Sequence, residues 1–344
     1  MAPRKQQQTP LPDGVEIIAT KLNKDIVSNI NNFDKTAIRF LVKYYYILQE
    51  HRKMLSGQIS SMDEDIKQSG LLQHFYGIQK YSENEIKRCL KIWTERTHLG
   101  QWCQSHVGIG PVITAGLMSN IDINIGTNAA KVTRYCGLDP NSKRVKGQKI
   151  NYNPDMKRLA WLIGRSFVFN CNRDGADYGL LYKERMRKET INSDNGLYKE
   201  QALMAYERIK NSRDKKKKVV VKIDEDDMHM EGEVENTTDV LTTLRSGRLT
   251  KSWLVARSAR WATKIFLSHY QYVATVIELG REPIRPYAFN ILKHADENYI
   301  PAYNWPLVMD EKKRDKKMPE IKLEKGKIVT EKFTEEETKE EEVA

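Results

Sequence analysis

The sequence predicts a mostly α-helical protein in which long antiparallel or coiled-coil helices precede a helical domain that contains a helix-hairpin-helix element. Three observations support this fold class. Apolar residues recur at heptad spacing from residue 41 onward. A Gly-x-Gly turn separates two helical patterns at Gly108–Gly110. Alternating strand patterns are almost missing from the 344 residues.

The first long helix is predicted to begin after Asp34, a residue type that caps helices. Its apolar seam follows a 4-3 alternation over about four heptads. The seam consists of Leu41, Tyr45, Leu48, Leu55, Ile59, Met62 and Ile66, with Arg52 as its one polar member. This pattern suits both a helix packed antiparallel on its neighbour and a dimerising coiled coil. Ser82–Glu85 resembles a capping box and predicts the start of the returning helix.

The stretch His106–Leu117 has the layout of a helix-hairpin-helix element. Gly108 and Gly110 permit a tight turn and a close approach to a partner. The N–H groups at the start of the next helix, including that of Val112, can hold a phosphate. Most Gly-x-Gly turns are only helix caps, so this turn by itself is a weak indication of nucleic-acid binding.

A basic loop follows between Pro140 and Pro154, with no acidic residue in it. Its cations are Lys143, Arg144, Lys146 and Lys149. We expect these side chains to neutralise phosphates, and the alternative is an ordinary solvated loop. Tyr152 and Trp161 are candidates for stacking on bases, although a tryptophan in an apolar helix is more often part of the core.

Further helices are predicted on both sides of this loop. Thr127 is expected to cap a short helix that ends at Gly137, and Asp155 to open an apolar helix. A long helix is predicted from Lys251 to Leu279, ended by Gly280.

The charge of the chain is unevenly distributed. The net charge is +11, but residues 307–344 contain 10 Lys or Arg and 12 Asp or Glu, so residues 1–306 carry +13. A basic body favours a polyanionic partner. The four cysteines are scattered without a Cys-x-x-Cys pair, so we expect no metal site. The chain lacks an apolar run of membrane-spanning length and a signal-peptide core, so we expect no membrane association and a cytoplasmic location, at the nucleoid in a prokaryote.

The order of these motifs resembles the C-terminal domain of the DEDD/serine insertion-sequence transposases, the "IS one-ten" group that includes the Piv-type invertases. In that family a "PGIGP-x-x-A" hairpin precedes an "A-x-x-x-G-L-x-P" helix and turn, and a helix rich in "L-R-R-A" follows. The matching segments here are Gly108-Ile109-Gly110-Pro111, Gly137-Leu138-Asp139-Pro140 and Lys157-Arg158-Leu159-Ala160. The resemblance covers roughly residues 34–188 and 249–285.

The resemblance implies DNA as a partner and, for some members, a structured RNA. Family members carry a ribonuclease-H-like domain whose four acidic residues bind Mg²⁺, and their C-terminal domain supplies a serine nucleophile. Metal ions neutralise charge on the reacting phosphate, and a hydroxyl nucleophile conserves the phosphodiester energy in a covalent intermediate.

This sequence departs from the family pattern at two points. About 33 residues precede the connector helix, too few for the acidic domain, so we expect no cofactor in this chain and Mg²⁺ only if a partner supplies that domain. The serine of the matching loop is Ser142, and no Gly follows it. Ser142 is the candidate catalytic nucleophile, and an ordinary turn serine is the alternative.

We therefore divide the chain into five parts. These are an N-terminal disordered or extended arm (1–33), a helical connector (34–105), a hairpin-containing DNA-binding domain (106–188 with 249–285), a charged insertion (189–248) and a C-terminal extension with a disordered tail (286–344). The connector helices offer a route to a homo-oligomer.

Three functions remain open on this basis. The first is a transposase or site-specific recombinase that acts in DNA transposition or recombination with a metal-binding partner. The second is a non-catalytic DNA- or RNA-binding protein derived from such a transposase. The third is a scaffold in which the hairpin only packs helices. Whether the chain is an enzyme is left undecided by the sequence.

Overall fold

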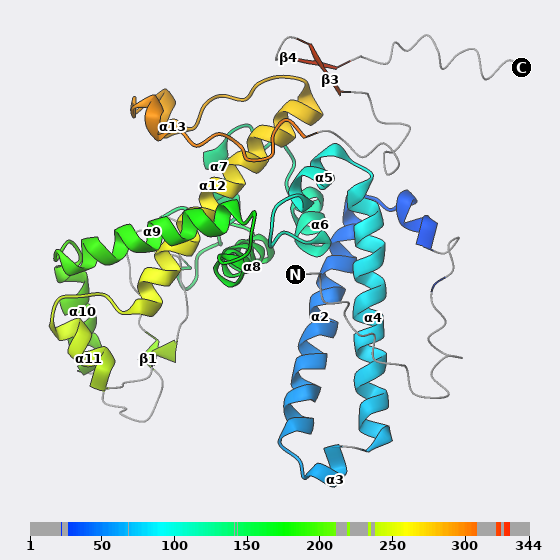
Figure 1. The fold of residues 1–344 in the computed structure, drawn as a ribbon, viewed down its shortest axis with the longest axis horizontal. Coiled ribbons are helices and arrows are strands. Elements are labelled where there is room, and N and C mark those ends of the chain that lie inside the picture. Colours follow the sequence, from blue (N-terminus) through cyan, green and yellow to red (C-terminus); the bar gives the residue numbers. More distant parts are fainter. Residues whose placement is uncertain are drawn as a thin grey trace, which may run out of the picture.

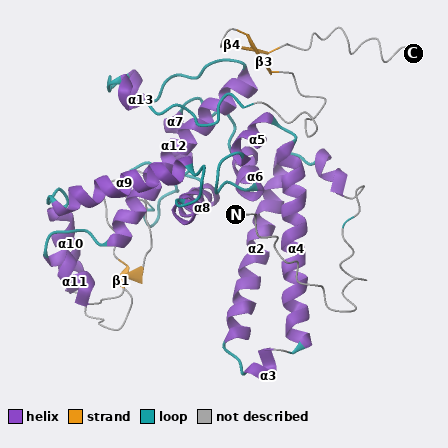
Figure 2. Ribbon diagram, viewed as in Figure 1, coloured by secondary structure: helices purple, strands orange, loops and turns teal. Residues whose placement is uncertain are grey.

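The computed structural model describes residues 22, 27–67, 69–140, 142, 144–210, 219–220, 233–234, 238–307, 321–324 and 327–330. Most of them lie in helices, as Figure 2 shows. In this described part, strands occur only in two antiparallel hairpins, β1 (Val219–Val220) with β2 (Glu233–Val234) and β3 (Ile321–Glu324) with β4 (Lys327–Thr330). The prediction of a mostly α fold is confirmed. Most of the N-terminal arm, the charge runs at 215–218 and 224–227, and most of the acidic tail lie outside the described residues.

Two long helices form a hairpin that extends from the body (Figure 1). A short 3-10 turn, η1 (Asn29–Asn32), precedes α2 (Lys35–Ser60), and Asp34 caps α2 as predicted, accepting a hydrogen bond from the Ala37 amide at 2.7 Å. The short helix α3 (Glu64–Lys67) leads into α4 (Gly70–Glu95), which returns antiparallel along α2.

The part of the predicted heptad seam that lies in α2 faces α4 within the same chain. The predicted helix continues to Ile66, but α2 ends at Ser60. Met62 and Ile66 lie beyond its end and are exposed. Tyr45 and Ile59 of the seam are buried, and the polar member Arg52 pairs with Glu83 of α4 at 2.6 Å. An arginine in an apolar seam is tolerated here because the facing helix supplies its counter-charge. The antiparallel alternative therefore describes this hairpin.

The predicted helix start at Ser82–Glu85 is wrong. Helix α4 begins at Gly70 and runs through this segment without interruption. The Ser82 hydroxyl donates to the Ile78 carbonyl at 3.0 Å, and Glu85 pairs with Arg88 at 2.7 Å. The serine bonds to the preceding turn instead of capping free N–H groups, so a Ser-x-x-Glu pattern within a helix mimics a start signal.

Four shorter helices connect the hairpin to the body. They are α5 (His98–Gln104), α6 (Pro111–Asn120), α7 (Ala129–Tyr135) and α8 (Pro154–Asn170). Helix α6 contacts α2 and α4 of the hairpin and also α5 and α8. The caps of α7 and α8 are Asn128 and Asn153, each one or two residues from the predicted Thr127 and Asp155.

Helix α12 (Lys251–Leu279) is the central element of the body, and it has the predicted bounds. Gly280 ends it in the left-handed conformation with φ 61°. Helix α12 contacts α5, α7, α8 and α9 (Asp177–Asp194), and Figure 1 shows it crossing the body diagonally. The aromatic centre of this core contains Trp102, Phe167, Tyr178, Phe266 and Tyr270, all fully buried.

Two further helices, α10 (Lys199–Lys210) and α11 (Thr238–Arg245), pack together with a small core of their own. Its buried residues are Tyr198, Ala202, Ala205, Ile209, Leu244, Leu249 and Leu254. The segment expected to be a charged insertion from residue 189 therefore contains folded structure, and its first residues belong to α9.

The C-terminal part of the described chain packs back on the core after α13 (Tyr287–Asn290) and η2 (Asp296–Asn298). The Trp102 indole donates to the Tyr303 carbonyl at 2.9 Å, and His98 Nε2 donates to the Leu307 carbonyl at 2.6 Å. Within the described residues no helix combines the length and apolarity that a membrane span requires.

Candidate nucleic-acid interface

The predicted hairpin turn joins α5 to α6, and Gly108 lies at its tightest point. Gly108 has φ 97°, in the region that favours glycine, and its carbonyl accepts from the Ser166 hydroxyl of α8 at 2.6 Å. A Cβ atom at Gly108 would lie 2.8 Å from Ser166 Oγ. Gly108 is thus required by the turn and by its contact with α8, so its backbone is already engaged within the fold.

The start of α6 is the part of the hairpin that is open to a partner. Gly110 is the N-cap residue and makes no side-chain hydrogen bond, and a Cβ placed there would meet nothing within 4 Å. Pro111 occupies the first helical position. The Val112 side chain is buried in the cluster with Ile38 and Ala115, so only its backbone N–H could face a ligand. Phosphate binding here stays a prediction.

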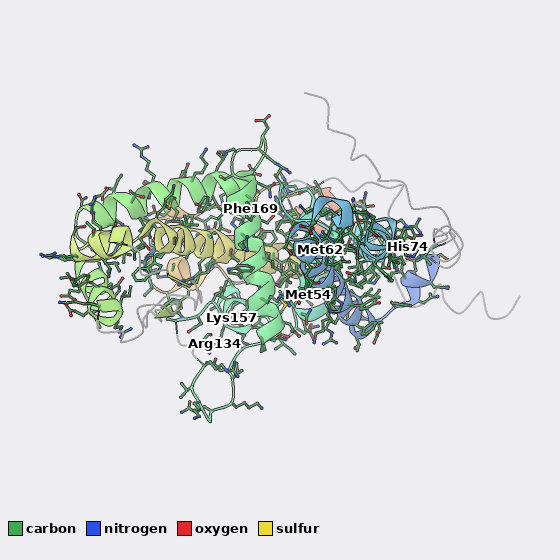
Figure 3. All side chains as sticks on the ribbon, turned by 90° about the horizontal axis from the view of Figure 1, so that it is seen from below. Met54, Met62, His74, Arg134, Lys157 and Phe169 are labelled. Carbon is green, nitrogen blue, oxygen red and sulfur yellow. The ribbon has the colours of Figure 1, made fainter. Side chains whose placement is uncertain are left out.

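The basic loop between α7 and α8 has its predicted cations in solvent. Arg144, Lys146 and Lys149 are exposed, whereas Lys143 lies outside the described residues. Figure 3 shows the loop projecting from the body beside Arg134 and Lys157. The base of the loop is fixed, because the backbone N–H of Asn153 donates to the Tyr135 carbonyl at 3.0 Å.

An aromatic ring and a cation pack together at the base of this loop. Lys157 Nζ lies 4.5 Å from the centre of the Tyr152 ring, and that ring also packs on Gly137. Tyr152 therefore has a packing role on at least one face. The Arg134 side chain of α7 is 66% exposed, and its Nε lies 3.5 Å from Asp139 Oδ2. Arg134 therefore adds an exposed cation near the loop, and the sequence analysis did not predict it.

The candidate nucleophile Ser142 is buried. Only 4% of this residue is exposed, its amide donates to the Asp139 carbonyl at 2.9 Å, and its hydroxyl has no hydrogen-bond partner among the described residues. A buried hydroxyl is not accessible to a DNA phosphate, and none of the described residues accepts a hydrogen bond from it, as a general base would. In this conformation Ser142 is a turn residue, and its catalytic role stays a prediction that requires the turn to open.

The exposed face of α8 carries a row of rings and a cation that sequence reasoning also missed. The Arg165 guanidinium lies 4.6 Å from the ring centre of Trp161 and 5.1 Å from that of Phe169. Phe169 is 71% exposed, and Figure 3 shows it and Lys157 at opposite ends of α8. The Trp-x-x-x-Arg-x-x-x-Phe spacing, which places the three side chains on one helix face, is the signal that could have revealed it.

The histidine next to the hairpin belongs to the core. His106 is 3% exposed and packs edge-on against Trp102, with 4.8 Å between ring centres. Burial, and secondarily the nearby His269, lowers the pKa of His106 to about 4, so the ring is neutral at pH 7. Among the described residues no three His, Cys, Asp or Glu side chains gather as a metal-binding group.

Comparisons with protein-family models, with curated proteins and with solved structures find no match. The family resemblance therefore rests on the order of the sequence motifs. The surface chemistry described above rests on the structure alone.

Proposed function

We propose that this chain is a nucleic-acid-binding protein of the DEDD/serine insertion-sequence transposase type. The observation that carries the proposal is the projecting loop with exposed Arg144, Lys146 and Lys149 and no acidic residue. The uncapped start of α6 and the exposed Arg134 add to it. Clustered exposed cations favour contacts with the phosphate backbone of a nucleic acid. Such contacts give affinity without sequence specificity.

The geometry favours binding over catalysis by this chain acting alone. Ser142 is buried, which supports a non-catalytic nucleic-acid-binding protein derived from a transposase. The alternative is a recombinase in which a partner chain supplies the acidic domain and its Mg²⁺ and opens the turn. A DNA partner would place the protein in the cytoplasm, at the nucleoid of a prokaryote.

The binding proposal is tested with a triple variant, Arg144→Gln/Lys146→Gln/Lys149→Gln. Duplex DNA affinity should fall, and the slope of log affinity against log salt should become shallower by up to about 2.7, at about 0.9 for each phosphate that is no longer neutralised. Fluorescence anisotropy over a salt series measures both quantities, and a structured RNA provides a second arm. The matched control removes three exposed lysines from the helical hairpin, Lys53, Lys87 and Lys91.

Equal effects of the two triple variants would overturn the role of the loop. Binding that is absent or indifferent to salt would instead support the scaffold alternative. The catalytic alternative is tested separately, by incubating the protein with Mg²⁺, co-purifying RNA and supercoiled DNA and looking for a covalent adduct on denaturing gels. An adduct that disappears in Ser142→Ala would establish the nucleophile.

A further inference from the structure

A second basic site lies away from the hairpin turn, in a cavity of about 310 Å³ between α9 and α12. Pro140, at the start of the basic loop, also lines it. The remaining lining residues that the structure describes are Arg185, Glu189, Arg257, Arg260, Trp261 and Lys264. The described lining thus contains four cations and one carboxylate, and this excess of positive charge favours anions.

Three of the cations come from one face of α12. Arg257, Arg260 and Lys264 follow one another at spacings of three and four residues, which places them side by side on a helix. Arg260 is only 5% exposed. Arg260 therefore holds a fixed positive charge in the cavity wall.

The carboxylate of Glu189 in the described lining positions two of the arginines. Glu189 is 1% exposed; Arg185 Nη2 lies 2.5 Å from its Oε1, and Arg257 Nε lies 3.1 Å from its Oε2. The Tyr198 hydroxyl donates to Glu189 Oε2 at 2.5 Å. Burial by itself would raise the pKa of Glu189, but Tyr198, Arg257 and Arg185 together lower it, so the carboxylate stays charged.

Arg185 contributes a further donor to this site. Arg185 Nε is buried and makes no hydrogen bond to any described residue, while its guanidinium lies 5.5 Å from the centre of the Trp261 ring. A buried donor of this kind is satisfied by a ligand oxygen at little cost, because its water has already been removed. Phosphate oxygens match the planar geometry of arginine donors.

We propose that the α9–α12 cavity binds a phosphate group of the nucleic-acid strand that the basic loop holds. The inference rests on the proposed function and extends it, because Pro140 belongs to both the cavity wall and the start of the loop. A strand bound along the loop therefore reaches the cavity edge. The same chemistry would accept a free phosphate or a mononucleotide, and the experiment separates these sources.

The test uses the full chain with Arg260→Gln and Lys264→Gln as separate variants. Lys251→Gln is the matched control, since Lys251 is exposed on the same helix and does not line the cavity. Anisotropy with a labelled single- or double-stranded oligonucleotide reports strand binding. Thermal denaturation in inorganic phosphate or a nucleoside monophosphate, against chloride at equal ionic strength, reports free-phosphate binding. Circular dichroism verifies that each variant is folded.

We expect each cavity variant to weaken oligonucleotide binding about tenfold, the effect of losing one charge-assisted hydrogen bond, while Lys251→Gln binds as the unaltered chain does. The cavity variants could instead lose stabilisation by phosphate without any change in oligonucleotide affinity. That result would overturn the inference that the cavity binds a phosphate of the strand, and it would establish a site for free phosphate.

Oligonucleotide binding that depends on the loop cations but not on Arg260 or Lys264, with no stabilisation by phosphate, would overturn the cavity and leave the proposed function standing. If no oligonucleotide binds at all, the proposed function and the strand inference fail together. Stabilisation by phosphate in that case would show that the cavity binds free phosphate. No stabilisation would show that the cavity binds neither a strand nor free phosphate.

Discussion

Replacing Glu189 with glutamine tests whether its charge holds α9 and α12 together. The carboxylate is 1% exposed and receives hydrogen bonds from Arg185, Arg257 and Tyr198. Removing one member of a fully buried ion pair costs about 3–5 kcal/mol. Because Arg185 and Arg257 are 33% and 20% exposed and regain some water, we expect the free energy of unfolding to fall by about 2–3 kcal/mol.

The assay is urea denaturation followed by circular dichroism at pH 7. The matched control is Glu50→Gln, which removes the partner of Arg158 in a surface pair with side-chain exposures of 57% and 53%. Surface pairs contribute about 0–1 kcal/mol, so the control should change little. If Glu189→Gln destabilised the protein no more than Glu50→Gln does, the reasoning from burial would be refuted.

The same variant should also alter the dependence of stability on pH. The folded protein holds the pKa of Glu189 below its ordinary value of about 4.3. A carboxyl with a lowered folded pKa stabilises the protein fully above its unfolded pKa, and this contribution disappears as the pH falls through the folded pKa. Glu189→Gln should therefore lose part of the acid sensitivity below about pH 4.3.

Two other predictions follow from the hairpin and its neighbouring core. Gly108→Ala should lower the free energy of unfolding by about 1–3 kcal/mol, because φ is 97° and the new Cβ would meet Ser166 Oγ at 2.8 Å; Gly110→Ala, with open space around it, should stay within about 1 kcal/mol, and urea titrations compare the two. His106 and His269 both have a pKa lowered to about 4 by burial, so the unfolded chain binds protons more readily and stability should fall from about pH 6.5 toward 4, by up to about 1.4 kcal/mol per pH unit for each ring. His106→Gln should reduce that slope in denaturation curves measured across this range, and an unchanged slope would show that the ring is not kept neutral in the folded state.

Local signals in the sequence predicted the helices well where start, stop and periodicity agree. The range from Lys251 to Leu279 is one example, because the apolar pattern is long and Gly280 ends it. The Asp34 cap is another. The Ser82–Glu85 signal failed, since its serine could bond to the preceding turn and nothing in the local sequence shows that the helix had already begun.

The candidate site was only partly accessible to sequence reasoning. The exposure of the loop cations could be predicted, because the loop is rich in charged residues and its apolar residues do not follow a helical or strand pattern. The burial of Ser142 could not be read from Pro-Asn-Ser-Lys, because it depends on how the turn packs on the body. The α9–α12 cavity was missed since Arg185 and Arg257 lie far apart in the sequence, and only the packing of the two helices makes them neighbours.

The return of residues 300–307 onto the core has a consequence for biosynthesis. The Trp102 indole donates to the Tyr303 carbonyl, and His269 Nε2 donates to the Ile300 carbonyl at 2.9 Å, so polar groups of the core find their acceptors in a segment that follows them in the sequence. Until residue 303 has emerged from the ribosome, the Trp102 indole has no such acceptor and this side of the aromatic centre stays uncovered. The nascent chain therefore exposes this apolar surface until both α12 and residues 300–307 have been synthesised.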